Sequence, residues 1–175
     1  GQGKPLRDAI ERGTPGSMIF WGPPGSGKTT LAHLVATTTA RVFVPFSAVT
    51  EGVPRIREIV NEARDRLESG SEQTILFIDE IHRLNKAQQD SLLPPAEDGT
   101  ITLIGATTEN PSFEVIGALL SRTRVFVLQP LTPDHIEILL QRALDDPERG
   151  LGRWKLEVEA DALRLMAVEA DGDAR

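Results

Sequence analysis

Short apolar runs rich in β-branched and aromatic residues alternate with stretches in which apolar residues recur at helical spacing. The predicted strands cover residues 17–21, 42–46, 74–78, 101–106 and 125–128. Amphipathic helices are predicted over residues 31–38, with residues 28–30 as the first turn, and over residues 56–67. Strands that alternate with helices predict an α/β fold, namely a doubly wound, parallel, five-stranded sheet flanked by helices.

The pattern changes beyond the fifth predicted strand. Helices are predicted over residues 133–144 and 159–169, joined by a Gly- and Asp-rich connector over residues 145–152. We therefore predict two domains. Residues 1–130 are predicted to form an α/β core that is truncated at its N-terminal end, and residues 131–175 to form the start of a small helical subdomain that is truncated at its C-terminal end.

Two proline features refine these elements. Pro45 lies inside the second predicted strand and places that strand at a sheet edge or at a strand end, because proline lacks the N–H that a central strand donates. The consecutive Pro94 and Pro95 predict a helix break, because a proline inside a helix removes a hydrogen bond and clashes with the preceding turn.

A glycine-rich stretch between the first predicted strand and the first helix fits the pattern G-x-x-x-x-G-K-[ST]. Backbone N–H groups of such a loop wrap phosphate oxygens, and the helix that follows adds its dipole. Lys28 is expected to reach the β- and γ-phosphates of ATP, and the Thr29 hydroxyl to ligate Mg²⁺. The predicted nucleotide-binding residues of this stretch are Gly22, Pro23, Pro24, Gly25, Ser26, Gly27, Lys28, Thr29 and Thr30.

Asp79 and Glu80 end the third apolar run, and ligands of such sheets bind beyond the carboxyl ends of the strands. We predict that Asp79 joins the nucleotide-binding set and holds Mg²⁺ through water. Glu80 is the predicted general base that orients and activates the attacking water. Taken alone, the pair is equally typical of an acidic strand end on a solvated rim. The P-loop at the same sheet edge favours the catalytic interpretation.

Other polar residues near the predicted strands are weaker candidates. Thr108 is the best choice for a contact with the γ-phosphate or the water, and Asn110 is the next, while a simple turn is the alternative. Arg122 and Arg124 are candidates for an arginine finger that acts on a neighbouring subunit's ATP, with a solvated charged turn as the alternative. A lone histidine such as His82 is more typical of a surface or capping residue than of a ligand.

Composition and charge narrow the functional classes. The formal net charge is −7, whereas a domain that binds nucleic acid over a broad face is usually basic. Any DNA contact is therefore expected to be local or to involve other parts of the protein. The chain has no cysteine, which excludes disulfides and thiolate metal sites. No apolar run approaches the roughly 20 residues of a membrane helix, and nothing resembles a signal peptide.

These motifs, in this order, resemble the AAA+ ATPases, and longer stretches narrow the resemblance. The chain resembles the replication-associated recombination protein A family, whose eukaryotic relative is the Werner-helicase-interacting protein. The stretches that carry this resemblance are residues 3–6, 17–22, 47–50, 82–90, 97–101, 105–113 and 119–122. The resemblance covers nearly the whole chain, and the run Thr-Thr-Glu-Asn-Pro-Ser-Phe over residues 107–113 is far more specific than a P-loop.

The resemblance implies roles by position. Lys28 and Thr29 correspond to Walker A, Asp79 and Glu80 to Walker B, and Thr108 to sensor 1, although members of the family differ in whether Thr107, Thr108 or Asn110 serves. Arg122 aligns with the arginine finger of the related clamp loaders, and Arg175 with the sensor 2 arginine. The catalytic residues implied are Glu80, Lys28, Thr108, Arg122 and Arg175. The family extends further at both ends, with an adenine-contacting segment before and an oligomerisation region after, so we expect this chain to be a fragment.

The predicted function is that of a DNA-dependent AAA+ ATPase in replication-fork maintenance and recombination, which uses ATP and Mg²⁺ to remodel DNA or replisome contacts. The resemblance implies forked, gapped or single-stranded DNA and single-stranded-DNA-binding protein as partners, and a homo-oligomer formed through the C-terminal region. It implies no membrane partner and a cytoplasmic location, associated with the nucleoid in a bacterium. The alternatives are a clamp-loader-type or RuvB-like subunit and an ATP-gated binding module with little turnover. The fragment alone is expected to hydrolyse ATP weakly, because the finger acts in trans.

Overall fold

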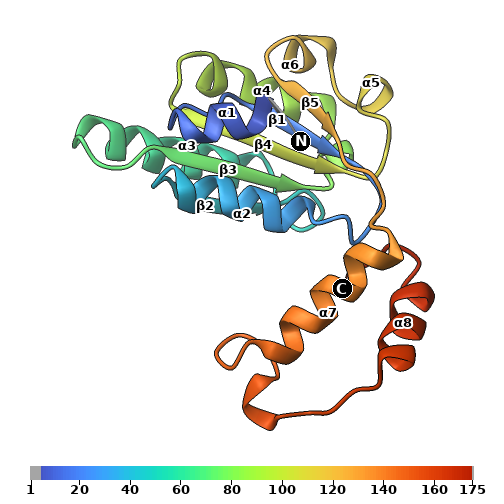
Figure 1. Ribbon diagram of the computed structural model, residues 1–175. Helices are drawn as coiled ribbons and strands as arrows, with labels where there is room; N and C mark the ends of the chain where they lie inside the picture. Colours follow the sequence, from blue (N-terminus) through green and yellow to red (C-terminus); the bar gives the residue numbers. More distant parts are fainter. Residues whose placement is uncertain (1–4, 175) are drawn as a thin grey trace. The chain divides into compact units, whose positions relative to one another are not determined.

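A computed structural model describes residues 5–174 of the chain. The chain divides into two compact units (Figure 1). The first unit comprises the described residues up to Gly22 together with Lys28–Val127. The second comprises Pro23–Gly27 together with the described residues from Leu128 onward.

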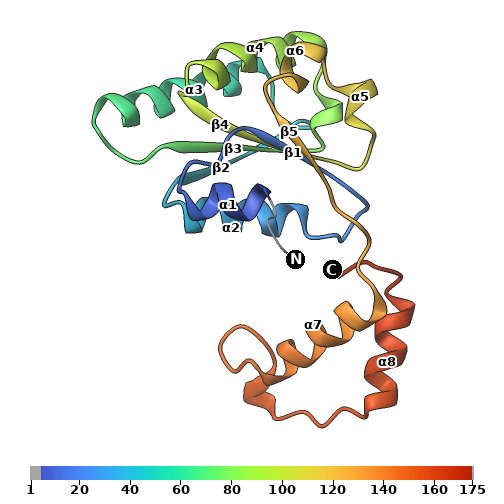
Figure 2. The same ribbon diagram turned by 45° about the horizontal axis from the view of Figure 1, so that its top comes forward.

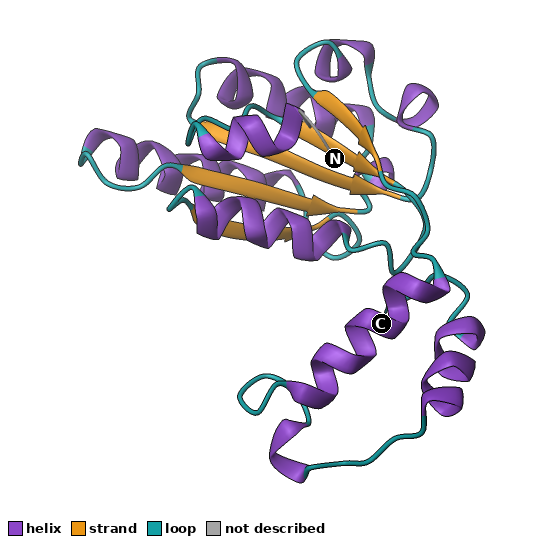
Figure 3. Cartoon of the chain, viewed as in Figure 1, coloured by secondary structure: helices purple, strands orange, loops and turns teal. Residues whose placement is uncertain are grey.

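The first unit is built on a five-stranded sheet in the order β2-β3-β4-β1-β5, in which all neighbouring strands are parallel (Figure 3). The strands are β1 (Met18–Trp21), β2 (Val42–Ser47), β3 (Thr74–Asp79), β4 (Ile101–Thr107) and β5 (Arg124–Val127). Each lies within one residue, at either end, of the strand predicted from the apolar runs. The predicted parallel α/β sheet is therefore confirmed.

Helices cover both faces of this sheet, with α3, α4 and α6 on one face and α1 and α2 on the other (Figure 2). The helical segments of the first unit are α1 (Pro5–Glu11), α2 (Lys28–Thr38), α3 (Val53–Glu68), the 3₁₀ turn η1 (Ile81–Arg83), α4 (Lys86–Glu97), α5 (Pro111–Glu114) and α6 (Gly117–Leu120). The first five residues of β3 are buried, because this inner strand is covered on both faces. The buried core is thus continuous from α3 and α4 to the sheet.

The two proline predictions had different outcomes. Pro45 lies in β2, an edge strand of the sheet, as predicted. The helix break at Pro94 and Pro95 was wrong, because α4 runs through both prolines to Glu97. Both prolines lie in the last turns of α4, where Leu92 and Pro95 are buried and hold the helix in place despite the two missing N–H donors. The helix ends normally, with the Asp98 N–H donating to Pro94 O at 3.0 Å.

The second unit contains a pair of helices, α7 (Pro133–Asp145) and α8 (Ala160–Glu169), and the 3₁₀ turn η2 (Gly152–Trp154). Thr132 caps α7 in a capping box with His135. Arg164 of α8 reaches across to Asp134 and Glu137 of α7, at 2.5 and 3.1 Å. None of the helices in the described part of the chain is long and apolar enough to cross a membrane.

Candidate active site

Three adjacent strands of the first unit, β3, β4 and β1, bring the candidate residues to one edge of the sheet. Trp21 of β1 pairs with Thr107 of β4, and the next residue, Gly22, donates its N–H to Thr107 O at 3.1 Å. On the other side of β4, Ile78 pairs with Gly105, so that Asp79 follows at the same edge. The predicted convergence of the strand ends is therefore present in the structure.

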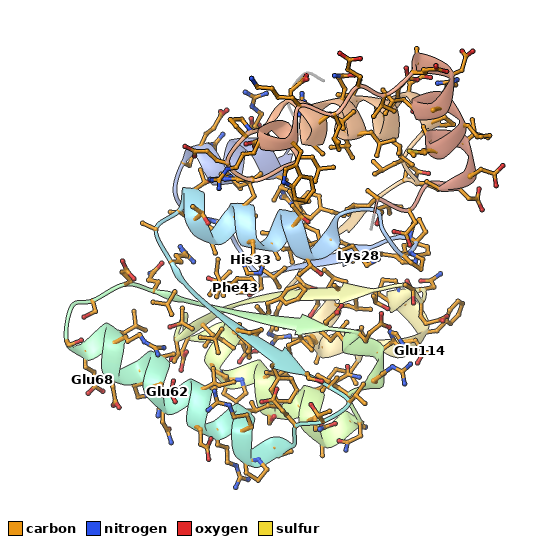
Figure 4. All side chains as sticks on the ribbon, turned by 90° about the horizontal axis from the view of Figure 1, so that it is seen from below. Lys28, His33, Phe43, Glu62, Glu68 and Glu114 are labelled. Atoms are coloured by element: carbon orange, nitrogen blue, oxygen red, sulfur yellow. The ribbon has the colours of Figure 1, made fainter. Side chains whose placement is uncertain are left out.

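Lys28 joins the two ends of the glycine-rich segment. Its Nζ donates to Gly22 O at 2.8 Å, and its side chain is buried although it carries a charge. Figure 4 labels Lys28 at the beginning of α2. The first-turn N–H groups of α2 are not used by the helix itself and, with the helix dipole, favour an anion at this end. Thr29 and Thr30 are exposed in this first turn, where the sequence placed them.

The intervening segment Pro23–Gly27 belongs to the second unit. Gly25 and Gly27 have φ angles of +68° and +87°, a region that side chains with a Cβ atom rarely adopt. The Ser26 hydroxyl donates to Pro23 O at 2.8 Å and stabilises the turn. A Cβ atom at Gly25 would lie 2.0 Å from Asp173 Oδ1, so glycine is also required for this close approach. Arg175, the predicted sensor 2 arginine, lies outside the described residues.

The two carboxylates at the end of β3 differ in backbone and exposure. Asp79 is exposed, and its Oδ1 accepts from the Glu80 N–H at 3.1 Å. Glu80 adopts the left-handed conformation, with φ 53° and ψ 48°. A non-glycine residue in this region is uncommon and costs about 1–2 kcal/mol. Such strain collects at functional sites, so the conformation of Glu80 supports a specific role for its side chain.

Because His82 is a lone histidine in the sequence, we predicted a surface or capping residue. The structure shows that it is neither. Its Nε2 lies 3.2 Å from Glu80 Oε2, and its Nδ1 lies 2.9 Å from Thr107 Oγ1. Its side chain is only 14% exposed. The prediction for a lone histidine was wrong because the residue that His82 contacts in β4, Thr107, is 25 residues away in the sequence. The sequence did carry one signal, since His82 lies two residues beyond a strand-end carboxylate.

The segment after β4 holds the candidate sensor residues. Thr107 is fully buried, and its Oγ1 accepts from the Glu109 N–H at 3.0 Å. Thr108 is partly exposed at the sheet edge. The Asn110 side chain accepts from the Ser112 N–H at 3.0 Å and thereby caps α5. Thr108 therefore fits a γ-phosphate contact better than Asn110, whose side-chain oxygen has a structural role.

The candidate finger residues lie at the turn between α6 and β5. Arg122 forms an ion pair with Glu97 at the end of α4, and it also donates to Ala118 O at 2.8 Å. Its side chain remains 44% exposed. Arg124 is the first residue of β5 rather than part of the turn before it, because the strand begins one residue earlier than predicted.

Gln89 is a buried residue of α4 that the sequence analysis did not identify. Its Nε2 donates to Leu84 O at 3.1 Å and to Glu114 O at 3.0 Å, and its Oε1 accepts from the Ile116 N–H at 2.9 Å. One amide thus ties the segment after η1 to the segment between α5 and α6. These bonds span up to 27 residues, and the sequence carries no local signal for them.

The residues present fit a nucleotide accompanied by Mg²⁺. Among the residues that the structure describes, no three His, Asp or Glu side chains gather to hold a metal ion. Mg²⁺ is usually bound by one or two protein groups together with phosphate oxygens and water, which suits the hydroxyl of Thr29 and the exposed carboxylate of Asp79. Buried Lys28 supplies positive charge beside the start of α2, where a polyphosphate would bind.

The chain is similar to proteins of known family. The family model described as "ATPase family associated with various cellular activities (AAA)" matches residues 18–131. The chain is 54% identical over 176 residues to the replication-associated recombination protein A of Haemophilus influenzae, covering 100% of this chain and 39% of that protein. It is 52% identical over 159 residues to the ATPase WRNIP1 of Dictyostelium discoideum, covering 91% of this chain and 18% of that protein.

Among solved structures, the RuvB Holliday junction branch migration motor of Thermotoga maritima aligns with a TM-score of 0.74 at 30% identity, covering 97% of this chain and 54% of RuvB. The chain spans less than two fifths of the length of the two curated relatives above. These relatives confirm the resemblance to the replication-associated recombination protein A family. Because the family model matches from β1 to residue 131, well over half of the chain, the protein belongs to the AAA family of ATPases.

Proposed function

We propose that this chain is the nucleotide-hydrolysing core of an AAA+ ATPase that acts on DNA during replication and recombination. The observation that carries the proposal is the arrangement at one sheet edge. The buried Lys28 closes the glycine-rich segment onto Gly22. Asp79 ends β3, two strands away from β1, and Glu80 follows it. A phosphate-binding cation and a pair of carboxylates at the same edge are the parts that phosphoryl transfer to water requires.

ATP is the proposed substrate. Lys28 and the first-turn N–H groups of α2 would bind its β- and γ-phosphates. Thr29 and, through water, Asp79 would hold Mg²⁺, which neutralises phosphate charge when bound. The loop glycines Gly25 and Gly27 support close backbone approach to phosphate oxygens, because their positive φ angles turn the chain tightly.

Each remaining residue has a role that its position supports. Glu80 would accept a proton from the attacking water, and Thr108, just beyond β4, would contact the γ-phosphate or that water. Arg122 would act on the ATP of a neighbouring subunit, since its side chain is partly exposed at the α6 turn. Arg175 is proposed as the sensor 2 arginine from the family resemblance alone.

For the complete protein, the name of the replication-associated recombination protein A relatives supports a role in replication and recombination. We propose forked, gapped or single-stranded DNA, single-stranded-DNA-binding protein and further copies of the same chain as partners. The proposed location is the cytoplasm, with association with the nucleoid in a bacterium. The second unit is proposed as the start of a helical lid. A RuvB-like motor is not favoured as the alternative, because RuvB is 30% identical to this chain and the replication-associated recombination protein A of Haemophilus influenzae is 54% identical.

The test is ATP hydrolysis by the complete protein with and without forked or gapped DNA, in wild type, Lys28→Ala and Arg122→Ala. We expect DNA to stimulate turnover and both substitutions to abolish the stimulation. Arg12→Ala, which removes an exposed arginine of the first unit, is the matched control and should leave turnover unchanged.

If DNA does not change the rate of ATP turnover, the ATPase activity is retained as the proposal and the DNA-coupled function is rejected. Turnover that survives Lys28→Ala would reject the proposed site itself. Stimulation by four-way junctions but not by forks or gaps would favour the RuvB-like candidate. The 175-residue chain alone is expected to turn over weakly, because the finger acts between subunits.

A further inference from the structure

His82 lies between Glu80, which follows β3, and Thr107, the last residue of β4: one ring nitrogen is hydrogen-bonded to Thr107, and the other lies at ion-pair distance from Glu80. It lies in η1, and its ring nitrogens contact Glu80 Oε2 at 3.2 Å and Thr107 Oγ1 at 2.9 Å. The ring is largely buried, so water competes poorly for either contact. These contacts form a chain of polar groups from the Glu80 carboxylate to the backbone that follows β4.

The hydrogens of this chain can be assigned from its geometry. Thr107 Oγ1 accepts the Glu109 N–H at 3.0 Å, which leaves its own hydroxyl hydrogen to be donated. His82 Nδ1, at 2.9 Å, is a closer acceptor than Glu109 O, at 3.3 Å. With Nδ1 accepting, the ring N–H lies on Nε2, the nitrogen 3.2 Å from Glu80 Oε2. The ring thus accepts from the hydroxyl and places its N–H beside the carboxylate.

The backbone around His82 is held in place independently of these contacts. Ile81 is fully buried, and Gly105 of β4 leaves the space that it occupies, since a Cβ atom there would lie 2.8 Å from Ile81 Cδ1. The left-handed conformation of Glu80 turns the chain from β3 into η1. The imidazole is therefore presented to Glu80 and Thr107 by a fixed turn, and the role of its nitrogens can be separated from that of the fold.

We propose that His82 is a positioning residue for Glu80: it holds the carboxylate in the orientation needed to activate water and links that orientation, through Thr107, to the segment containing Thr108. This inference rests on the proposed function, in which Glu80 is the general base and Thr108 contacts the γ-phosphate. If ATP binding shifts the turn after Thr107, the imidazole ring of His82 transmits that shift to the Glu80 carboxylate. Substitution of His82 is therefore expected to change the rate of ATP turnover rather than the affinity for ATP.

The test uses the complete protein and compares substitutions of His82 that keep a polar group at the position of only one of the two ring nitrogens. His82→Gln keeps an amide N–H near the Nε2 position, which faces Glu80, whereas His82→Asn keeps a polar group near Nδ1 and leaves Glu80 without this donor. We expect kcat to fall about 10- to 100-fold in His82→Asn and His82→Ala, the range for a hydrogen bond to a charged group. His82→Gln should retain most of kcat, and KM for ATP should change less than threefold in all three.

Thr107 supplies the second arm of the test. Thr107→Val removes the hydroxyl with little change of shape and should lower kcat, while Thr107→Ser should restore it. His33→Gln is the matched control, because His33 is an exposed histidine of α2 that stacks on Phe43, with ring centroids 3.8 Å apart (Figure 4). Binding of a fluorescent ATP analogue by each variant verifies that the site remains folded.

The outcomes separate this inference from the proposed function. If Glu80→Gln abolishes turnover and His82→Asn leaves kcat unchanged, the positioning role is wrong and the ATPase mechanism stands. If Glu80→Gln leaves turnover intact, the proposed mechanism itself fails. In the expected case, Glu80→Gln combined with His82→Asn turns over no more slowly than Glu80→Gln alone, because His82 acts through Glu80. A kcat as low in His82→Gln as in His82→Ala, with ATP binding intact, overturns the proposal.

Discussion

Arg122 and Glu97 form an ion pair that joins the turn after α6 to the last residue of α4. Each side chain is 44% exposed, so the pair contributes little to the free energy of unfolding, on the order of 0–1 kcal/mol. The main consequence of the ion pair is that it fixes the orientation of the Arg122 side chain. The Arg122 guanidinium is held by Glu97 on one side and by Ala118 O on the other, which restricts the directions in which it can reach a neighbouring subunit.

Glu97→Gln tests whether this orientation matters for turnover. We expect the urea midpoint of unfolding to stay nearly constant, while ATP turnover of the complete protein falls severalfold because the proposed finger loses its fixed direction. The measurements are steady-state hydrolysis and urea denaturation. Glu11→Gln, which breaks the exposed Arg7–Glu11 pair, is the matched control. Equal turnover in Glu97→Gln and the control would contradict the prediction.

The left-handed backbone of Glu80 gives a prediction about stability. At most positions glycine is less stable than alanine by about 0.5–1 kcal/mol. At Glu80 the order should reverse, with Glu80→Gly more stable than Glu80→Ala by about 1 kcal/mol, because glycine adopts positive φ without strain. Urea denaturation of the two variants checks the sign, and both should have lost turnover. An alanine variant as stable as the glycine variant would show that position 80 is not strained.

Gly105 tests the packing that supports η1. Alanine at this position brings a Cβ atom 2.8 Å from Ile81 Cδ1 and 3.3 Å from Ile81 Cγ2. We expect Gly105→Ala to destabilise the fold by about 1–3 kcal/mol and to lower turnover by displacing η1. Ile81→Val removes Cδ1, so the double variant should recover part of the stability lost in Gly105→Ala. Simple additivity of the two substitutions in thermal unfolding would argue against this contact as the cause.

The turn between α4 and β4 gives a pH-dependent prediction. Hydrogen bonds from Thr100, through its hydroxyl and its backbone N–H, hold the pKa of Asp98 below its usual range. A carboxylate with a lowered pKa stabilises the fold above its unfolded pKa, near 4, and this contribution disappears as the pH falls through the folded pKa. Asp98→Ala should therefore lower the urea midpoint slightly at pH 7, and the difference from wild type should shrink as the pH falls below the unfolded pKa of the carboxyl. For Glu72→Ala, in an exposed segment, the difference in urea midpoint from wild type should not shrink at low pH.

Local patterns were sufficient for the sheet and for the motifs at its edge. The five strands are continuous apolar runs, and the P-loop and the Asp79–Glu80 pair are each contiguous in the sequence, so neither requires knowledge of long-range contacts. The proline pair of α4 shows the limit of local rules. Propensity predicted a break, and burial of Leu92 and Pro95 against the core outweighed the lost hydrogen bonds.

The contacts that organise the site between these motifs were beyond sequence reasoning. His82 meets Thr107 across 25 residues, Gln89 meets Ile116 across 27, and Glu97 meets Arg122 across a similar span. Each joins a segment near α4 to the last residue of β4 or to a segment after it, and no spacing rule in the sequence predicts such pairs. They become visible only once β3 and β4 are known to be neighbours.

Pro45 of β2 also bears on how readily molecules of this protein aggregate. In the described sheet, β2 and β5 are the two edges. Pro45 interrupts the row of N–H donors along β2, which makes that edge a poor template for a strand from another molecule. β5 has no proline, and its Val125 and Val127 are exposed. Aggregation of partly unfolded chains should therefore begin along β5, and a lysine at Val127 is the substitution best suited to raise the yield of soluble protein.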